Sequence, residues 1–324
     1  MSSMTVTQDN PEEVTVNESP PSPAPIARTP LDRAVVLSLK IRAWGAGRRA
    51  NKEAIQTGET NKDFLTLGKK LLISPELAAI NKFDLITRAA IKARSMAFPL
   101  REGFAFINKT IVTKTIRLLE ERKVQREELV RAFIEDSYLI QKNTAQVELG
   151  PSQYRETDYP TVGELRKLFS MDWNFLELGT PQSLKEYDVE AYEVEREKLA
   201  EQMKNAGEEI MAALRTEVYK RISHLVERIT PTTDGKKKKF DASTVTKLQD
   251  LFDFFDVKNI MDDKDLANVV AKAREILTGV DAPALKTNEG LRDAVRTKLE
   301  EVTNDLDSLM KAAGTRRISF LEDE

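Results

Sequence analysis

Two long, highly charged stretches, residues 108–146 and 183–229, dominate this sequence of 324 residues. In the second stretch, apolar residues first recur at spacings of seven, four, three and four, and the rhythm then shifts, which is typical of a coiled coil with a stutter. These residues are Tyr192, Leu199, Met203, Ala206 and Ile210. The first stretch interleaves its apolar positions with charges at residues 120–123, which suits a solvated helix face. The two stretches therefore predict the arms of an antiparallel coiled coil, a structure that usually holds partners together.

The composition favours long solvated helices over a deeply cored enzyme. Charged residues make up 32% of the chain and aromatic residues 6%. The formal net charge of −3 supplies no global field that attracts nucleic acid or membrane, so such binding needs a local patch. The absence of cysteine excludes disulfides and thiolate zinc sites and fits a reducing cytoplasm. The sequence contains no run of about 18 apolar residues, so it predicts no membrane-spanning helix. Its N-terminal residues are polar and acidic, the opposite of a secretory signal.

We predict a mainly all-α fold, an elongated helical bundle with a long antiparallel coiled-coil hairpin. The expected regions are a disordered, Pro-rich acidic tail at residues 1–30, an N-terminal helical region at 31–107, the coiled-coil arms at 108–230 with a central insert at 147–182, a Lys-rich loop at 231–241, a C-terminal helical region at 242–314 and a flexible tail at 315–324. Disorder is expected in the first region because proline removes backbone donors and few apolar side chains offset the ordering entropy.

Local signals mark one helix start and one ambiguous element. Ser74, Pro75 and Glu76 fit an N-cap, a first helical residue and an acid at the positive end of the helix dipole. Apolar and polar residues alternate over residues 37–42, which predicts a short strand, although residues 34–39 could also begin a helix. A strand needs a partner, and residues 103–107 are a weak candidate. The fold therefore leaves room for one short N-terminal strand or hairpin.

A basic cluster around one tryptophan is the best candidate interaction surface. It consists of Lys40, Arg42, Trp44, Arg48, Arg49 and Lys52, with no acid among them. Arginines beside an aromatic ring can bind phosphate and stack a base. The alternative, which we favour, is that Trp44 anchors the first element in the core while the arginines pair with acids on the arms.

A second basic run follows the second arm and consists of Lys236, Lys237, Lys238 and Lys239. Four consecutive lysines can contact nucleic acid or an acidic partner. Runs of this kind are usually solvated, and we favour that interpretation.

The sequence indicates no catalytic, cofactor or metal site. The runs at residues 68–70 and 235–237 lack the spacing and the hydroxyl of a phosphate-binding loop. His224 is the only histidine, whereas a histidine-based metal site would need another nitrogen or sulfur ligand. Its place between apolar arm positions fits a helix flank better than a catalytic base. A serine nucleophile would lack a base in this chain, and a cysteine nucleophile would lack its thiol. We therefore predict that the chain is not an enzyme and uses no cofactor.

Four short motifs carry a family resemblance. They are VLSLKIRAW at residues 36–44, LGKKLLISP at 67–75, FPLREGF at 98–104, and LTGVD at 277–281 followed by Leu291 and Arg292. Over most of residues 31–309 the chain resembles an uncharacterised, mostly helical bacteriophage and bacterial family, catalogued as a domain of unknown function. Some members of such families are encoded near MoxR-type AAA+ ATPases and proteins with a von Willebrand A domain. The resemblance implies an accessory partner of an ATP-driven machine and carries over no catalytic residue.

The leading functional prediction is a non-enzymatic helical interaction or adaptor protein of phage or mobile-element origin, acting in the bacterial host cytoplasm. We expect a protein partner, with an AAA+ ATPase implied by the resemblance, and no membrane partner. The alternatives are a nucleic-acid-associated protein that uses the cluster around Trp44, and a structural or assembly component of a virion. A hairpin within one chain and a dimer across two would use the same apolar stripe, so the sequence leaves a homo-oligomer open.

Overall fold

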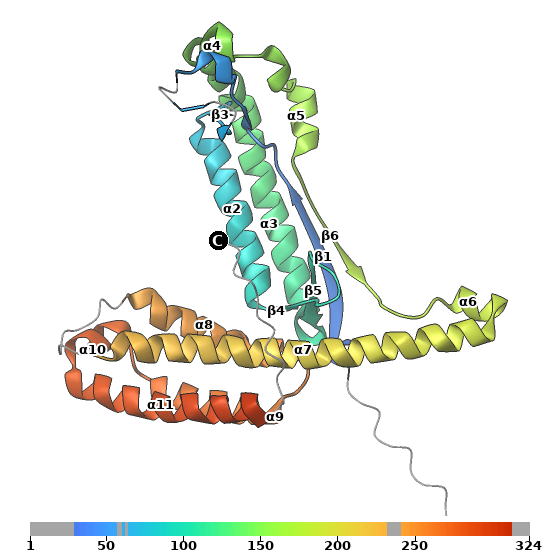
Figure 1. Cartoon of the computed structure of the whole chain (residues 1–324), viewed down its shortest axis with the longest axis vertical. Coiled ribbons are helices and arrows are strands. Elements are labelled where there is room, and N and C mark those ends of the chain that lie inside the picture. The colour runs from blue at the N-terminus through green and yellow to red at the C-terminus, as the bar shows by residue number, and fades with distance from the viewer. Residues whose placement is uncertain (1–28, 57–59, 62–63, 232–240, 313–324) are drawn as a thin grey trace, which may run out of the picture.

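The computed structural model describes residues 29–56, 60–61, 64–231 and 241–312, which form a tower standing on an elongated base (Figure 1). The tower helices are α2 (Pro75–Ala93), α3 (Val112–Ala132), α4 (Tyr138–Gln153) and α5 (Val162–Leu168). The base helices are α7 (Val189–Ile229), α8 (Ala242–Lys258), α9 (Lys264–Leu277), α10 (Ala282–Thr287) and α11 (Glu289–Ala312). The short helix α6 (Gln182–Tyr187) packs on the N-terminal end of α7.

Two antiparallel sheets belong to the tower. The larger sheet has the strand order β4-β5-β1-β6, and its strands are β1 (Ala34–Arg42), β4 (Ser95–Ala97), β5 (Phe104–Asn108) and β6 (Ser170–Leu176). The smaller sheet pairs β2 (Gly47–Arg49) with β3 (Gly68–Lys70). Helix α1 (Pro30–Arg33) leads into β1, in which Val36 pairs with Phe106 on one side and Leu176 on the other.

The prediction of an all-α fold is wrong. Helices make up 70% of the described residues, but strands make up 11% and form a four-stranded and a two-stranded sheet, so the fold is mixed α/β. Residues 34–39 belong to a strand rather than a helix, and that strand pairs with the predicted candidate at residues 103–107. Strand β6 was not predicted, because its pairing with β1 joins segments that lie far apart in the sequence.

The predicted antiparallel coiled coil between the two long stretches is also wrong. Helix α3 stands against α2 and the sheet, whereas α7 crosses the foot of the tower and packs mainly on α11 and α8 (Figure 1). The apolar stripe of α7 is buried, with Ile210, Leu214 and Val218 each at most 2% exposed. A helical stripe specifies which face is buried but not its partner, so the same pattern serves a helical bundle.

Side chains on the two faces of β1 enter different cores. Val36 belongs to the base core with residues of α7 and α8, whereas Leu37 packs with Ile107 and Leu119 in the tower core. A third core at the tip of the tower contains Trp44, Leu71, Ile80, Phe133, Tyr138 and Leu165. The central strand therefore joins base and tower.

Helix boundaries follow local signals. Ser74 is the N-cap of α2, where its Oγ accepts a hydrogen bond from the Leu77 N–H at 3.1 Å. Gly150, at φ 61°, interrupts α4 just before Pro151. A π-helical turn, Phe133–Ser137, joins α3 to α4 and was not predicted. The described part of the chain contains no helix with the length and apolarity needed to cross a bilayer.

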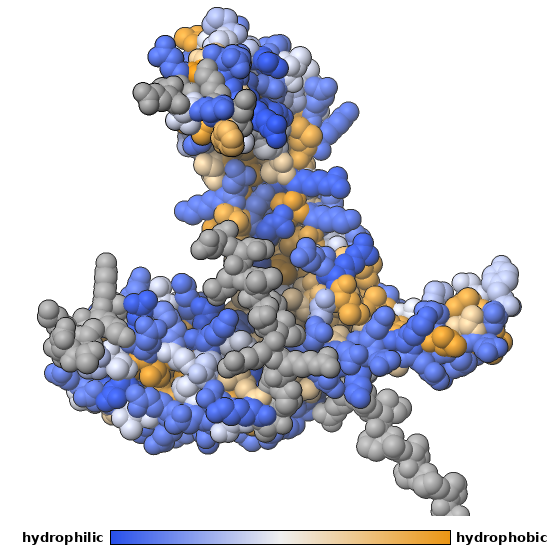
Figure 2. All heavy atoms as spheres, in the orientation of Figure 1, coloured by the Kyte–Doolittle hydropathy of each residue, from blue (hydrophilic) through white to orange (hydrophobic). Residues whose placement is uncertain are grey.

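The surface is mostly hydrophilic, with apolar residues gathered along the side of the tower near β6 and close to the N-terminal end of α7 (Figure 2). The first place lies at the margin of the tower core, where Trp173 and Phe175 are only partly buried.

We predict that Phe106→Ala destabilises the protein by about 3–5 kcal/mol, because the side chain is fully buried beside the base core. Phe64→Ala is the matched control, because that side chain is 87% exposed and should change stability by less than about 0.5 kcal/mol. Urea unfolding followed by circular dichroism measures both. Equal effects of the two substitutions would contradict the assignment of the core.

Candidate interaction surface

The basic cluster predicted from the sequence is divided by the fold. Lys40 and Arg42 lie at the exposed end of β1, on the face opposite Leu39. Trp44 is only 5% exposed and meets Tyr138 edge to face, with 5.8 Å between ring centroids. Because the indole is packed in the tip core, it is not available to stack on a base.

The ribbon formed by β2 and β3 separates the remaining basic residues into two faces. Arg48 pairs with Lys69, while Gly47 and Arg49 pair with Lys70 and Gly68. Successive side chains of a strand point to opposite faces. The inner face of the ribbon therefore carries Arg48 and Lys69, and the outer face carries Arg49, Lys70 and the two glycines.

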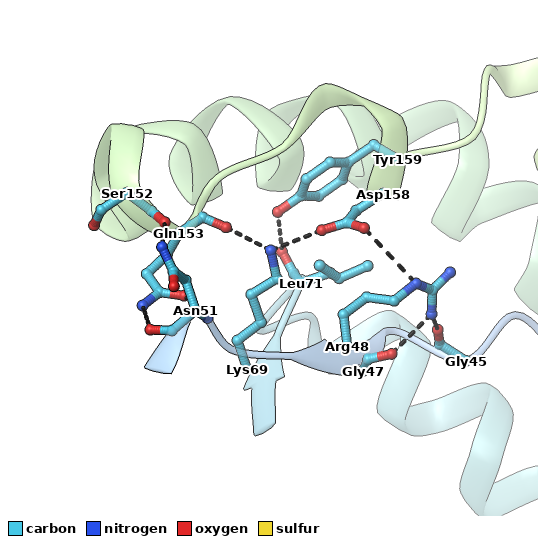
Figure 3. A network of polar contacts seen from close by, with 10 residues as sticks. All are labelled: Gly45, Gly47, Arg48, Asn51, Lys69, Leu71, Ser152, Gln153, Asp158 and Tyr159. Carbon is cyan, nitrogen blue, oxygen red and sulfur yellow. Dashed lines mark hydrogen bonds and ion pairs between the residues drawn. The ribbon is translucent and has the colours of Figure 1, made fainter. Parts of the chain in front are cut away.

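The inner face is held by the segment that follows α4 (Figure 3). Lys69 Nζ lies 2.7 Å from Asp158 Oδ2 and also donates to the Gln153 carbonyl, and its side chain is only 7% exposed. Arg48 Nε lies 4.0 Å from Asp158 Oδ1, while its Nη1 donates to the Gly45 carbonyl at 2.9 Å. These two cations are partnered and serve the structure of the tip.

Neighbouring hydrogen bonds fix the same junction. The Tyr159 hydroxyl donates to the Leu71 carbonyl at 3.0 Å, and burial raises the pKa of this phenol. The Asn51 N–H donates to Gln153 Oε1 at 2.8 Å, and Gln153 Nε2 donates back to the Asn51 carbonyl at 2.9 Å. Figure 3 shows that these contacts join the residues flanking the ribbon to the end of α4 and the segment after it.

The outer face of the ribbon is exposed and basic. Arg49 and Lys70 are exposed, and the glycines beside them, Gly47 and Gly68, leave the backbone bare. Lys52 follows the ribbon in a 3-10 turn and is half-buried. Arg49 of the cluster and Lys70 of the neighbouring strand therefore present charge that an outside anion can reach.

A buried ion pair stabilises the end of β1, which leads into the ribbon. Arg126 of α3 is 3% exposed, and its Nε and Nη2 lie 2.7 and 3.0 Å from the two carboxylate oxygens of Asp84 on α2. Its Nη2 also donates to the Arg42 carbonyl at 2.7 Å. One guanidinium therefore joins α2, α3 and the end of β1.

The second predicted basic run lies beyond what the structure describes, and His224 stands alone. Lys236, Lys237, Lys238 and Lys239 lie outside the described residues. His224 is exposed on α7. The described parts of the chain contain no group of three or more His, Cys, Asp or Glu residues arranged to hold a metal ion.

Comparisons with protein-family models, with curated proteins and with solved structures find no match to this chain.

Sequence reasoning missed Lys70, which shares the outer face with Arg49, and Asp158, which neutralises the inner face. A signal was present, because residues 47–49 and 68–70 both read Gly-basic-basic. Antiparallel pairing of two such segments places one basic residue of each on either face. The pairing itself was not evident from either segment alone.

We predict that Asp84→Ala destabilises the protein by about 3–5 kcal/mol, because it leaves the buried Arg126 guanidinium without its counterion. Asp172→Ala is the control, because its contact with Lys123 is 3.7 Å long and the two side chains are 60% and 40% exposed. Thermal and urea unfolding measure the two variants. Similar losses would show that the Asp84 pair has no special role.

Proposed function

We propose that this chain is a non-enzymatic interaction protein of phage or mobile-element origin, an accessory partner of a MoxR-type AAA+ ATPase and a von Willebrand A protein in the host cytoplasm. The observation that carries the proposal is a projecting helical arm, residues 182–202, formed by α6 and the beginning of α7 (Figure 1). The family resemblance supplies the identity of the partners.

The arm extends beyond the cores. Between Tyr192 and Met203 no residue of α7 is buried, although the helix continues without a break. Helix α6 packs against this segment, where Gln182 Nε2 donates to the Tyr192 hydroxyl at 3.2 Å and Lys185 lies 5.6 Å from the centre of the Tyr192 ring. A helix maintained outside the core in this way has the geometry of a docking element.

The arm exposes apolar side chains at its end. Tyr187 is 88% exposed, Val189 59% and Val194 47%. Aromatic and aliphatic anchors of this kind dominate the binding energy of protein interfaces when a partner covers them. These three residues are the contacts that we expect to matter most.

The charge of the arm indicates the partner surface. Residues 182–202 include seven acidic and three basic residues, a formal charge of −4. Two of the basic residues are held within the helix, where Arg196 pairs with Glu193 at 2.7 Å and Lys198 with Glu195 at 2.6 Å. The complementary surface is an apolar groove with a basic rim, and opposite charge accelerates and orients such an encounter.

We expect the triple variant Tyr187→Ala, Val189→Ala and Val194→Ala to lose most of the binding to the ATPase or von Willebrand A partner, with a drop of about tenfold or more. The measurement is a nuclease-treated pull-down from native host or phage-infected cells with mass spectrometry, followed by titration of the purified partner. The triple variant Leu139→Ala, Ile140→Ala and Val147→Ala is the control, because it removes three equally exposed apolar side chains from the tower.

Two results contradict this proposal. Equal binding by the arm and tower variants would remove the arm from the interface. Intrinsic ATP turnover by the purified chain would overturn the non-enzymatic assignment.

A second candidate function is nucleic-acid binding, which the outer face of the β2–β3 ribbon favours. Arg49 and Lys70 are exposed there, and the glycines opposite them allow a phosphate backbone to approach the ribbon. The buried indole of Trp44 removes base stacking from this candidate, so the remaining recognition is electrostatic. Such binding is insensitive to sequence and weakens steeply with salt.

We predict that, if this second function operates, raising salt from about 50 to about 200 mM weakens oligonucleotide binding strongly, and Arg49→Glu with Lys70→Glu abolishes it. Fluorescence anisotropy with a labelled single-stranded oligonucleotide measures both effects. Lys247→Glu with Lys298→Glu is the charge-matched control on the base. Retention of binding by the ribbon variant would exclude the outer face as the binding surface.

A further inference from the structure

One edge of the larger sheet is open. Strand β6 is seven residues long and is the last strand in the order, so only its β1 side is paired. Among the described residues, no hydrogen bond reaches the backbone of β6 apart from its ladder with β1. Alternate N–H and C=O groups of an antiparallel edge strand point away from its neighbour, so β6 presents a row of unused donors and acceptors.

The opposite edge of the same sheet is treated differently. Strand β4 has only three residues, Ser95–Ala97, and α8 packs beside it. Ser95 and Met96 are buried. Short length and a covering helix are common protections of an edge, and β6 has neither of them.

The open edge is apolar on the side that faces α3. Met171 is buried, and Trp173 and Phe175 are partly buried at the margin of the tower core. Figure 2 shows apolar residues gathered over this part of the tower. A strand added to β6 would continue this row, because side chains on paired strands share faces.

A pocket of about 190 Å³ lies between α3 and the start of β6. Its apolar lining comes from Val130, Phe169 and Met171. Its charged lining is balanced, with Lys123 and Arg126 against Glu127 and Asp172. The Arg126 guanidinium already holds Asp84, so the pocket favours an uncharged side chain of a few heavy atoms.

We propose that β6 binds an extended segment of a partner protein by strand addition, with apolar side chains at every second position and one of them in the pocket beside Val130. Backbone hydrogen bonds to β6 supply affinity, and the pocket supplies selectivity. The balanced charge of the pocket and the single charge on β6, Asp172, fit an uncharged strand.

The ends of the edge favour a single extended chain over a second copy of this protein. Helix α5 precedes β6, and the arm projects past the other end of the strand (Figure 1). A second copy pairing through its own β6 would bring a whole tower and a projecting arm to this edge. A peptide strand brings only its own backbone and side chains to this edge.

The test uses the full chain and a labelled peptide of alternating valine and threonine, matched in length to β6, with lysines at its ends. We expect binding by anisotropy, a blue shift of Trp173 emission, and slower hydrogen exchange at alternate amides of β6. The same peptide with proline at its central valine should not bind, because proline removes a ladder donor and disrupts pairing. Binding by neither peptide, or equally by both, overturns the proposal.

Two variants of the protein test whether the peptide occupies the pocket. Val130→Glu should weaken binding by about tenfold or more, whereas Val124→Glu, at an exposed valine on the same helix, should not. Equal affinities of the two variants overturn the pocket assignment.

If Val130→Glu fails to fold, the pattern of amide exchange in the unchanged chain still decides whether a strand is added to β6. Slow exchange at every β6 amide in the free chain would show that the edge is already covered and would also overturn the proposal.

This surface extends the proposed function, because it is a binding place separate from the arm. The two tests are independent. Failure of the peptide assay leaves the arm proposal standing, and failure of the arm variant leaves the peptide assay informative.

Discussion

The rest of the structure depends on β1 burying its two faces in two different cores. Val36 and Leu37 are neighbours in the sequence, yet each is 1% exposed in a separate apolar cluster, one in the base and one in the tower. Successive side chains of a strand must point in opposite directions, so the covalent chain itself sets the base against the tower. A slip of one residue in the register with β5 or β6 would exchange both sets of contacts, which specifies the register strongly. The arm, the ribbon and the open edge all take their positions from this strand.

Much of the helical content was predictable, because its causes are local. The cap at Ser74, the break at Gly150 and the stripe through Ile210 and Leu214 are each encoded within a few residues. The partners of the helices were not encoded locally. The coiled-coil prediction failed because a sheet occupies the position beside α3, and that sheet depends on pairing between β1 and the distant β6. Strand β6 offered Trp173 and Phe175 as a pattern, but a strand with one neighbour and a half-covered face gives a weak signal.

The candidate surface was predictable in composition and not in geometry. Arg48 and Arg49 are equivalent in the sequence, and only the pairing of β2 with β3 shows that Arg48 lies on the face beside Asp158 while Arg49 lies on the outer face. Trp44 could stack or anchor on sequence grounds, and its packing on Tyr138 makes it an anchor. The sequence shows which residues are charged, but only the fold shows which residue each of them pairs with. For this reason Arg126, whose pairing with Asp84 joins three elements, was not distinguished in the sequence from the other charges on the same helix.

The continuity of α7 gives the molecule a mechanical property. The part of this helix that belongs to the arm rises about 20 Å before it reaches the base, and the same helix then becomes the spine of the base core. Where the two parts meet, a Cβ added at Gly207 would lie 2.7 Å from Met261 Cε, so the helix is pressed closely against its support. Such an arrangement is a lever with a fulcrum at Gly207. A force applied at Val194, within this helix, is carried as a torque into the base rather than absorbed by a hinge.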